Sequence, residues 1–333
     1  MSEPYVAILV GLGLVGSVFA AVHHAETVAQ RVGEPYGTLV LALAVTLIEV
    51  SLIGSITLAG HGQAATLARD TVFATVMIIL NGIVGLSLLV GGLRHQVQEF
   101  SLEGVSAALV ALGAIVILTL VFPNFTVTTP GPFYSGSQLT FVAIVSVVIY
   151  GGYLLTQTIS HRRLFLDGAS AFEHAPGTAP PSIAVASASA VLLLLCLSVV
   201  VVSAHILSPL LEVKVAAWGA PNAVVGIVIA ALVLLPEGIA ALRAARQNRL
   251  QSSLNLALGS ALASIGLTIP TISILSLLAG VKLELGIDMK SVVLLVLSLF
   301  TTTIILRTGR TMILHGVVLI VLFLVYLFFT TVP

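Results

Sequence analysis

Two stretches of this chain decide its fold, and they read GEPYGTLVLALAVTLIEVSLIGSITLAG at residues 33–60 and GAPNAVVGIVIAALVLLPEGIAAL at residues 219–242. Each opens on Gly-x-Pro and continues as an apolar run of about 20 residues, which is long enough to cross a bilayer as a helix. Within the apolar run each stretch carries one acidic residue, Glu49 or Glu237. The two stretches therefore resemble copies of one membrane-spanning element.

The depth of these two acidic residues indicates a function. At about 1.5 Å per residue, Glu49 lies about 21 Å along the helix axis from Pro35, and Glu237 about 24 Å from Pro221. A carboxylate at the centre of a spanning helix costs roughly 2.5–3.5 kcal/mol, so it normally faces a wet cavity, a partner or a cation. No predicted span carries a basic residue near its middle, which makes an internal ion pair the less favoured explanation.

The composition is that of a membrane protein. Hydrophobic residues make up 58% and charged residues 8% of the 333 positions, against about 25% charged residues in a soluble domain. Basic and acidic residues balance at 13 each, so there is no basic surplus for nucleic acid. The single cysteine, Cys196, excludes a disulfide framework and a cysteine metal site. The chain enters its first span without a basic leader region, and we expect that segment to be retained.

The apolar runs predict ten membrane-spanning helices, which lie near 4–23, 35–59, 69–91, 103–122, 139–158, 183–207, 221–242, 252–279, 287–306 and 312–331. A polar stretch rich in Gly, Pro and Ser, at 161–182, separates them into two groups of five. We therefore expect a first repeat over 1–160, a linker over 161–182 and a second repeat over 183–333.

The distribution of Lys and Arg predicts the orientation. One face of the predicted bundle holds nine of these residues, Arg31, Arg94, Arg162, Arg163, Arg243, Arg246, Arg249, Arg307 and Arg310; the other holds four, Arg69, Lys214, Lys282 and Lys290. The richer face should be cytoplasmic. This orientation places the linker inside and both termini outside.

An odd number of spans in each half inserts the second half upside down relative to the first. The predicted fold class is thus an all-α membrane protein of ten transmembrane helices arranged as two inverted five-helix repeats, an architecture typical of secondary transporters. The two glutamates follow their prolines by 14 and 16 residues. A kink at Pro236 would absorb that difference.

Polar side chains near the two acids are candidate cation ligands. Thr46 lies one turn from Glu49, Asn81 lies in the third span, and the eighth span carries Ser260 in a stripe with Ser253, Ser264 and Thr271, beside a small-residue seam that includes Asn255. Oxygen ligands of this kind suit calcium, sodium or protons. Packing is the alternative role, because Ser, Thr and Gly often line contacts between membrane helices.

Histidines near the membrane boundaries suggest a second role. His24 belongs to the cluster HHAE at 23–26, and His205 lies near the outer end of the sixth span. Because histidine titrates near neutral pH, either could act as a proton relay or gate. Anchoring at the interface is the simpler explanation.

Three segments carry a family resemblance: GEPYGTLVLALAVTLIEVSL, RDTVFATVMIILNGIVGLSLL, and the long run from PNAVVGIVIAALVLLPEG to GSALASIGLTIP. They resemble the calcium/proton exchanger family of the cation/calcium exchanger superfamily, and most of all its bacterial Cha-type sodium(calcium)/proton antiporters. The resemblance implies that Glu49 and Glu237 bind cation and protons by turns. It also matches Asn81 to the asparagine of the helix after the first glutamate, and Gly259 and Ser260 to the Gly-Ser pair of the second half.

These observations favour a secondary active antiporter that exports calcium, sodium or potassium from the cytoplasm in exchange for protons, by alternating access at a midplane site. Burial favours a protonated carboxyl group and a bound cation favours an ionised one, so competition would couple the two fluxes. The expected partners are these ions and the lipid bilayer, with no cofactor, no enzymatic activity and no nucleic acid; a homo-oligomer is compatible with the sequence.

Two alternatives remain open at this stage. A passive cation channel could use the same polar groups. An intramembrane metal-dependent hydrolase could use HHAE and His205 as ligands, although the cluster lacks the H-E-x-x-H spacing that places two histidines on one helical face and the chain contains no G-x-S-x-G element.

Overall fold

The computed structural model describes residues 3–33, 36–58, 64–165, 181–217, 219, 221, 223–280 and 282–332. Long helices account for most of these residues, because in a bilayer the backbone must satisfy its hydrogen bonds within the segment. The α-helices are α1 (Glu3–Val32), α2 (Tyr36–Leu58), α3 (Ala64–Met77), α4 (Val84–His95), α5 (Leu102–Val116), α6 (Gly136–Leu155), α7 (Ile183–Ala217), α8 (Ala223–Arg246), α9 (Leu250–Ala279), α10 (Met289–Leu306) and α11 (Ile313–Thr331).

Nine helical segments of the described residues are long and apolar enough to cross a membrane. They correspond to nine of the ten predicted spans, with α3 and α4 joined into one segment over Thr66–His95. The remaining predicted span, 35–59, corresponds to helix α2. The structure does not describe several side chains of α2, and α2 is not among the nine segments. The nearly all-helical membrane architecture agrees with the prediction.

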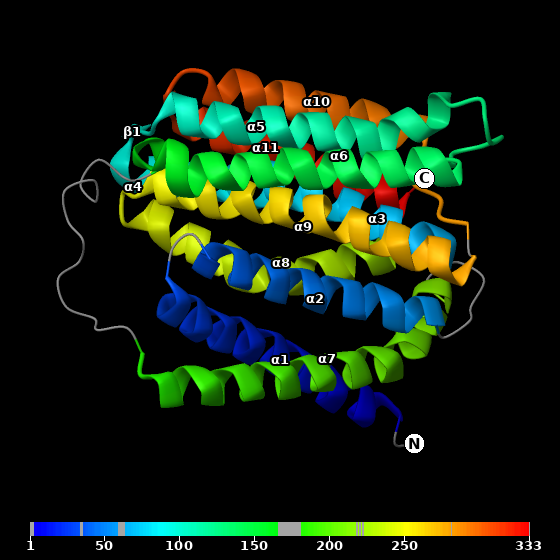
Figure 1. Cartoon of the computed structure of the whole chain (residues 1–333). Coiled ribbons are helices and arrows are strands. Elements are labelled where there is room, and N and C mark those ends of the chain that lie inside the picture. Colours follow the sequence, from blue (N-terminus) through cyan, green and yellow to red (C-terminus); the bar gives the residue numbers. More distant parts are fainter. Residues whose placement is uncertain are drawn as a thin grey trace.

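The helices run roughly along one common direction in a bundle (Figure 1). Helices α1 and α7 pack against each other along one edge, and α2 contacts both α1 and α7 as well as α9. Both chain ends lie at one end of the bundle, whereas α6 ends and α7 begins at the other (Figure 1). The segment that joins the two halves of the sequence therefore starts and finishes opposite the termini.

Two apolar clusters form the interior. The larger one is built from residues of α3 to α6 and α8 to α11, and the smaller one from α1, α2, α7, the first half of α8 and Leu67 of α3. Helix α8 contributes to both, with Ile229 and Val233 in the smaller cluster and Leu234 and Ala241 in the larger one. The boundary between the clusters thus passes along α8 close to Glu237.

Three spans contain short π-helical segments, η1 (Ile78–Ile83), η2 (Ile117–Val121) and η4 (Thr156–Ser160). Such segments are frequent at functional sites, and η1 contains Asn81. Helix α8 continues through Pro236 and α9 through Pro270 without interruption of either helix. The backbone of α8 is therefore helical both before and after Pro236, the residue that precedes Glu237.

Short connections fix the two ends of the bundle. Beyond α4, strand β1 (Gln98–Glu99) pairs antiparallel with β2 (Arg310–Thr311). The 3-10 turn η3 (Phe122–Phe125) follows η2, and η5 (Arg162–Phe165) follows η4. At the end where the termini lie, Arg69 donates hydrogen bonds to Asp70 over 2.8 Å, to the carboxylate of Glu284 and to the carbonyl of Gly286 over 3.1 Å. These bonds join α3 to the segment before α10.

The loop before α6 packs onto the same end. Tyr134 donates a hydrogen bond to the carbonyl of Leu118 over 2.5 Å, and burial raises the pKa of its hydroxyl to about 12. This hydroxyl therefore stays protonated at physiological pH and acts as a fixed donor.

Candidate cation site

Glu49 lies on α2 with only 1% of its surface exposed. Its Oε2 atom accepts two hydrogen bonds from α9, one from Ser264 Oγ over 2.5 Å and one from Thr268 Oγ1 over 2.9 Å. Its Oε1 atom is buried and has no hydrogen-bond partner among the described residues. Helix α9 thus orients the carboxyl group and leaves one of its oxygens available to a ligand.

Glu237 lies on α8, which packs against α9 and α2. Its Oε2 atom is also buried and has no partner within the described part of the chain. The carboxyl groups of Glu49 and Glu26 lie close enough for their charges to interact with that of Glu237. None of the ion pairs found among the described residues involves Glu49 or Glu237. Two acidic groups from different halves of the sequence therefore share one region without a basic partner.

Helix α9 presents a line of hydroxyl groups to this region. Ser260, Ser264 and Thr268 follow each other at intervals of four residues, which places them on one face of the helix. Ser260 Oγ is buried and lacks a partner among the described residues. Ser260 was a predicted ligand, Ser264 belonged to the predicted stripe, and Thr268 was missed. The four-residue spacing was the signal that could have identified Thr268.

Asn81 has a different set of neighbours. It is fully buried in η1, and its Nδ2 atom donates a hydrogen bond to Ser298 Oγ of α10 over 2.8 Å. Its Oδ1 atom is buried and has no partner in the described ranges. The structure therefore joins Asn81 to α10, whereas Ile83, two residues further on, lies beside Gly238 of α8.

Of two further predicted ligands, Thr46 lies close to Glu49 in the sequence of α2, whereas Asn255 bonds to groups outside the site. Thr46 is buried on α2 one turn before Glu49 and interacts with other groups of the protein. Asn255 accepts a hydrogen bond from Gln251 over 2.9 Å and donates one to the carbonyl of Phe165. Nine residues separate Asn255 from Ser264, about half a rotation around α9. The structure therefore does not bring Asn255 to the two carboxyl groups.

The small-residue seam that includes Asn255 faces α6 instead. A Cβ atom added to Gly266 would lie 2.8 Å from Cβ of Tyr150, and one added to Gly259 would lie 3.8 Å from the hydroxyl of Tyr153. One face of α9 thus packs on α6 while the opposite face carries the hydroxyl groups that bond Glu49.

None of the hydrogen bonds found at Glu49 involves a histidine. The rings of His23 and His24 are 5.5 Å apart on α1, and Nδ1 of His24 is buried without a partner among the described residues. Glu26 is exposed on the same helix. His205 lies in α7, but its side chain is outside the described residues. Within the described part of the chain, no three His, Cys, Asp or Glu side chains form a cluster that could hold a metal ion.

Comparison with known proteins assigns the family. The profile of the family described as sodium/calcium exchanger protein matches residues 3–159 and 188–332. The chain belongs to this family. It is therefore a multi-pass membrane transporter that exchanges cations and not an enzyme, and the resemblance to calcium/proton exchangers is confirmed.

Relatives of this chain cover nearly its whole length. The y4hA protein of Sinorhizobium fredii is 47% identical over 98% of this chain and 89% of its own. The sodium-potassium/proton antiporter ChaA of Escherichia coli is 36% identical over 95% of this chain and 86% of its own. The crystal structure of the H+/Ca2+ exchanger CAX superimposes with a TM-score of 0.75 at 17% identity, covering 97% of this chain and 80% of CAX. The last comparison shows that the fold is shared.

Proposed function

We propose that this exchanger exports calcium, sodium or potassium from the cytoplasm in exchange for protons, and that Glu49 and Glu237 form the shared binding site. One observation carries the proposal: a buried carboxyl oxygen of each glutamate has no hydrogen-bond partner among the described residues. In addition, none of the ion pairs found among the described residues involves either glutamate. A buried anionic group without a partner is unfavourable. A proton or a cation would remove this cost.

Competition for these oxygens would supply the coupling. The cation binds ionised carboxylates, whereas protons neutralise them, so a site of this kind holds one or the other. The relatives support the choice of ions, since ChaA is named for sodium, potassium and protons and CAX for calcium and protons. Oxygen ligands of the protein suit all of these cations.

The inverted-repeat architecture belongs to the same proposal. The family profile matches one segment on each side of the 161–182 linker, which supports two repeats of five spans. The glutamates lie where the smaller apolar cluster, with α1, α2 and α7, meets the larger one. A movement of one cluster against the other would open the site alternately to the two sides, with both termini outside and the linker in the cytoplasm of a bacterial cell.

His24 and Glu26 offer a route for protons towards Glu237. Glu26 is exposed and interacts electrostatically with Glu237, and His24 carries a buried ring nitrogen without a partner in the described residues. Both belong to the end of α1 that we expect to face the cytoplasm. We propose the same role, a proton relay or gate, for His205 because of its position in the sequence.

The test is cation-dependent proton flux in everted vesicles. Glu49→Gln and Glu237→Gln should each abolish the flux while the protein remains folded, because an amide cannot alternate between proton and cation. Glu99→Gln is the matched control, since Glu99 is an exposed acid paired with Arg310 over 2.9 Å at the end of the bundle. Exchange that persists in both site variants would refute the assignment.

The same vesicles identify the cation. Calcium, sodium and potassium are offered in turn over a series of pH values, and the half-saturating concentration of each should rise as the pH falls, since protons compete for the carboxylates. Cation flux that proceeds without any proton movement would indicate a channel and would contradict exchange.

A further inference from the structure

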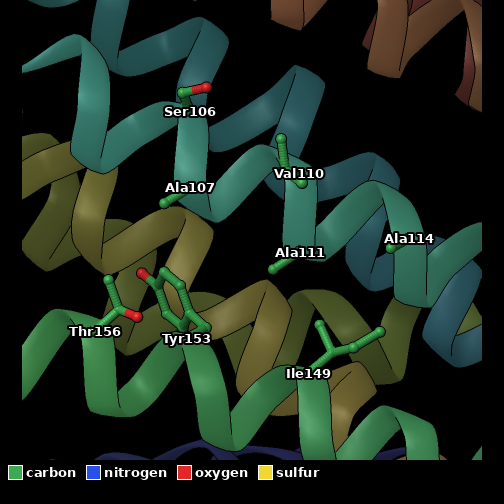
Figure 2. A pocket seen from close by; sticks show the side chains of 8 residues that line it. All are labelled: Ser106, Ala107, Val110, Ala111, Ala114, Ile149, Tyr153 and Thr156. Atoms are coloured by element: carbon green, nitrogen blue, oxygen red, sulfur yellow. The ribbon is translucent and has the colours of Figure 1, made fainter.

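A groove on the outside of the bundle is lined by none of the residues proposed for the cation site. It lies between α5 and α6 and encloses a cavity of about 430 Å³, which is within the roughly 300–1,000 Å³ range of ligand pockets. Ala107, Ala111 and Ala114 of α5 form one wall, and Ile149 and Tyr153 of α6 with Thr156 of η4 form the other (Figure 2). The small side chains of α5 leave the space that larger residues would fill.

The groove opens towards the surface that faces lipid. Val110, which also lines it, is 70% exposed, and the neighbouring Ala114 is exposed as well. Most of its wall is apolar, so a hydrocarbon chain can fill it without leaving polar groups unsatisfied.

The polar groups gather at one end. Ser106 lies at the start of α5, and Thr156 begins η4 at the end of α6. Tyr153 is 5% exposed, and its hydroxyl has no partner among the described residues. Figure 2 shows the Tyr153 ring standing in the space between the helices, with its hydroxyl on the side of Thr156. A buried donor of this kind is normally satisfied by a partner, which indicates that a polar ligand group or water belongs there.

Basic residues follow directly beyond this polar end. Arg162 and Arg163 are exposed in η5, and neither takes part in an ion pair found among the described residues. The position of η5 is fixed by α5, because a Cβ atom added to Gly104 would lie 2.6 Å from the carbonyl oxygen of Leu164. Ser106 follows Gly104 by only two residues, about 3 Å along the helix. The arginines therefore lie beside the polar end of the groove.

We propose that this groove binds an anionic phospholipid, with an acyl chain between α5 and α6 and the phosphate at Arg162 and Arg163. Basic pockets between membrane helices on the cytoplasmic side attract anionic head groups, and the predicted orientation places η5 on that side. Glu103, exposed beside Gly104, offsets part of the positive charge. The proposal is independent of the cation site.

A second copy of the chain is the competing occupant. In a symmetric dimer the same surface meets itself, so an interface centred on this groove would bring the Arg162 and Arg163 pairs of both copies towards each other. Repulsion between these like charges disfavours that arrangement, whereas a phosphate neutralises them.

Native mass spectrometry of the purified full chain tests the proposal, with dioleoyl phosphatidylglycerol and dioleoyl phosphatidylcholine as probes. The wild type should retain phosphatidylglycerol preferentially. The double variant Arg162→Gln/Arg163→Gln should lose affinity for it by roughly 30-fold, given the attraction expected for two basic groups. Glu103→Gln should bind it more tightly, and Ala111→Phe should exclude it by filling the groove. Arg307→Gln removes an exposed arginine from the same predicted face, beyond α10, and should bind as the wild type does.

Three results would overturn the proposal. Equal retention of both lipids would show that charge does not select the ligand. Unchanged affinity for phosphatidylglycerol in the double arginine variant would show that the two arginines do not bind its phosphate. An Ala111→Phe variant that keeps its lipid and loses self-association would make the groove an interface between copies. Thermal unfolding confirms that each variant is folded. Cation-dependent proton flux in vesicles tests the proposed exchange by itself, so a failure of lipid binding can be distinguished from a failure of the proposed function.

Discussion

The two oxygens of the Glu49 carboxyl group have different surroundings. Oε2 accepts hydrogen bonds from Ser264 and Thr268, whereas Oε1 has no partner among the described residues. The hydroxyl donors stabilise the ionised form, and they also hold the group in one orientation. A cation would therefore approach Oε1 and leave the bonds of Oε2 in place.

Removing these donors should weaken cation binding. Hydrogen bonds to charged groups contribute about 1.5–3 kcal/mol each, so Ser264→Ala or Thr268→Val should raise the half-saturating cation concentration by roughly tenfold or more at constant pH. The maximal flux should fall less, because both carboxyl groups remain. The measurement is cation-dependent proton flux in everted vesicles over a concentration series.

Thr271→Val is the matched control for Thr268→Val. Thr271 lies on the same helix, but its hydroxyl donates to the carbonyl of Leu267 in its own helix over 2.7 Å. The control should transport as the wild type does. If both threonine variants changed the cation dependence equally, the effect would come from the helix and not from the bond to Glu49.

The acids of this site and part of the hydroxyl stripe beside them, Ser264 included, could be predicted from the sequence, whereas Thr268 was missed. Glu49 and Glu237 stand out because each is a lone acid in an apolar run. Thr268 continues the four-residue spacing of Ser260 and Ser264, but the lipid-facing and core-facing sides of a membrane helix are both apolar, so hydropathy alone does not show which face of α9 turns towards Glu49. The same ambiguity explains why Asn255, on the opposite face, was chosen as a ligand.

Among the elements, α9 connects the site to the rest of the bundle. One face bonds the glutamate of α2, and the other packs closely on α6, where Gly266 leaves no room for a side chain beside Tyr150. Close approach at small residues is a common means of joining membrane helices. The position of the hydroxyl groups thus depends on this contact.

Gly266→Ala should therefore destabilise the protein. Its methyl group would lie 2.8 Å from Cβ of Tyr150, which forces α6 and α9 apart, and overpacking of this kind costs about 1–3 kcal/mol. Gly151→Ala on α6 is the control, because a Cβ atom there meets nothing within 4 Å. It should be neutral or stabilising by up to about 1 kcal/mol, since alanine favours a helix over glycine.

Thermal unfolding in detergent measures both variants. A Gly266→Ala protein that unfolds at the same temperature as the wild type would show that α6 and α9 adjust without cost, and the close contact would lose its structural importance.

The spans themselves were accessible from the sequence, because a run of about 20 apolar residues has little alternative to a helix in a bilayer. The prediction was less accurate at the ends. Helix α1 extends to Val32, beyond the predicted end at 23, and α7 extends to Ala217, beyond 207. Both extensions are polar enough to leave the apolar run yet retain helix-forming residues, so hydropathy marks the membrane boundary and not the end of the helix.

At the scale of the whole molecule, the arrangement of the chain ends agrees with an even number of crossings. Both termini lie at one end of the bundle, and the junction of the two halves lies at the other (Figure 1). Ten crossings would give this arrangement, and the arginine-rich side would then be cytoplasmic.

Cysteine labelling should establish that orientation. In a Cys196→Ala background, which removes the single native thiol, Val127→Cys places a thiol at a residue that is 95% exposed in the loop between α5 and α6. Arg307→Cys places one at an exposed residue just after α10. The arginine distribution assigns the first position to the outside and the second to the cytoplasm.

A membrane-impermeant maleimide should therefore label Val127→Cys in intact cells and Arg307→Cys only in everted vesicles. Because the two variants share one background and one reagent, the reverse pattern would mean an inverted molecule, and labelling of both from one side would require an even number of crossings between Val127 and Arg307.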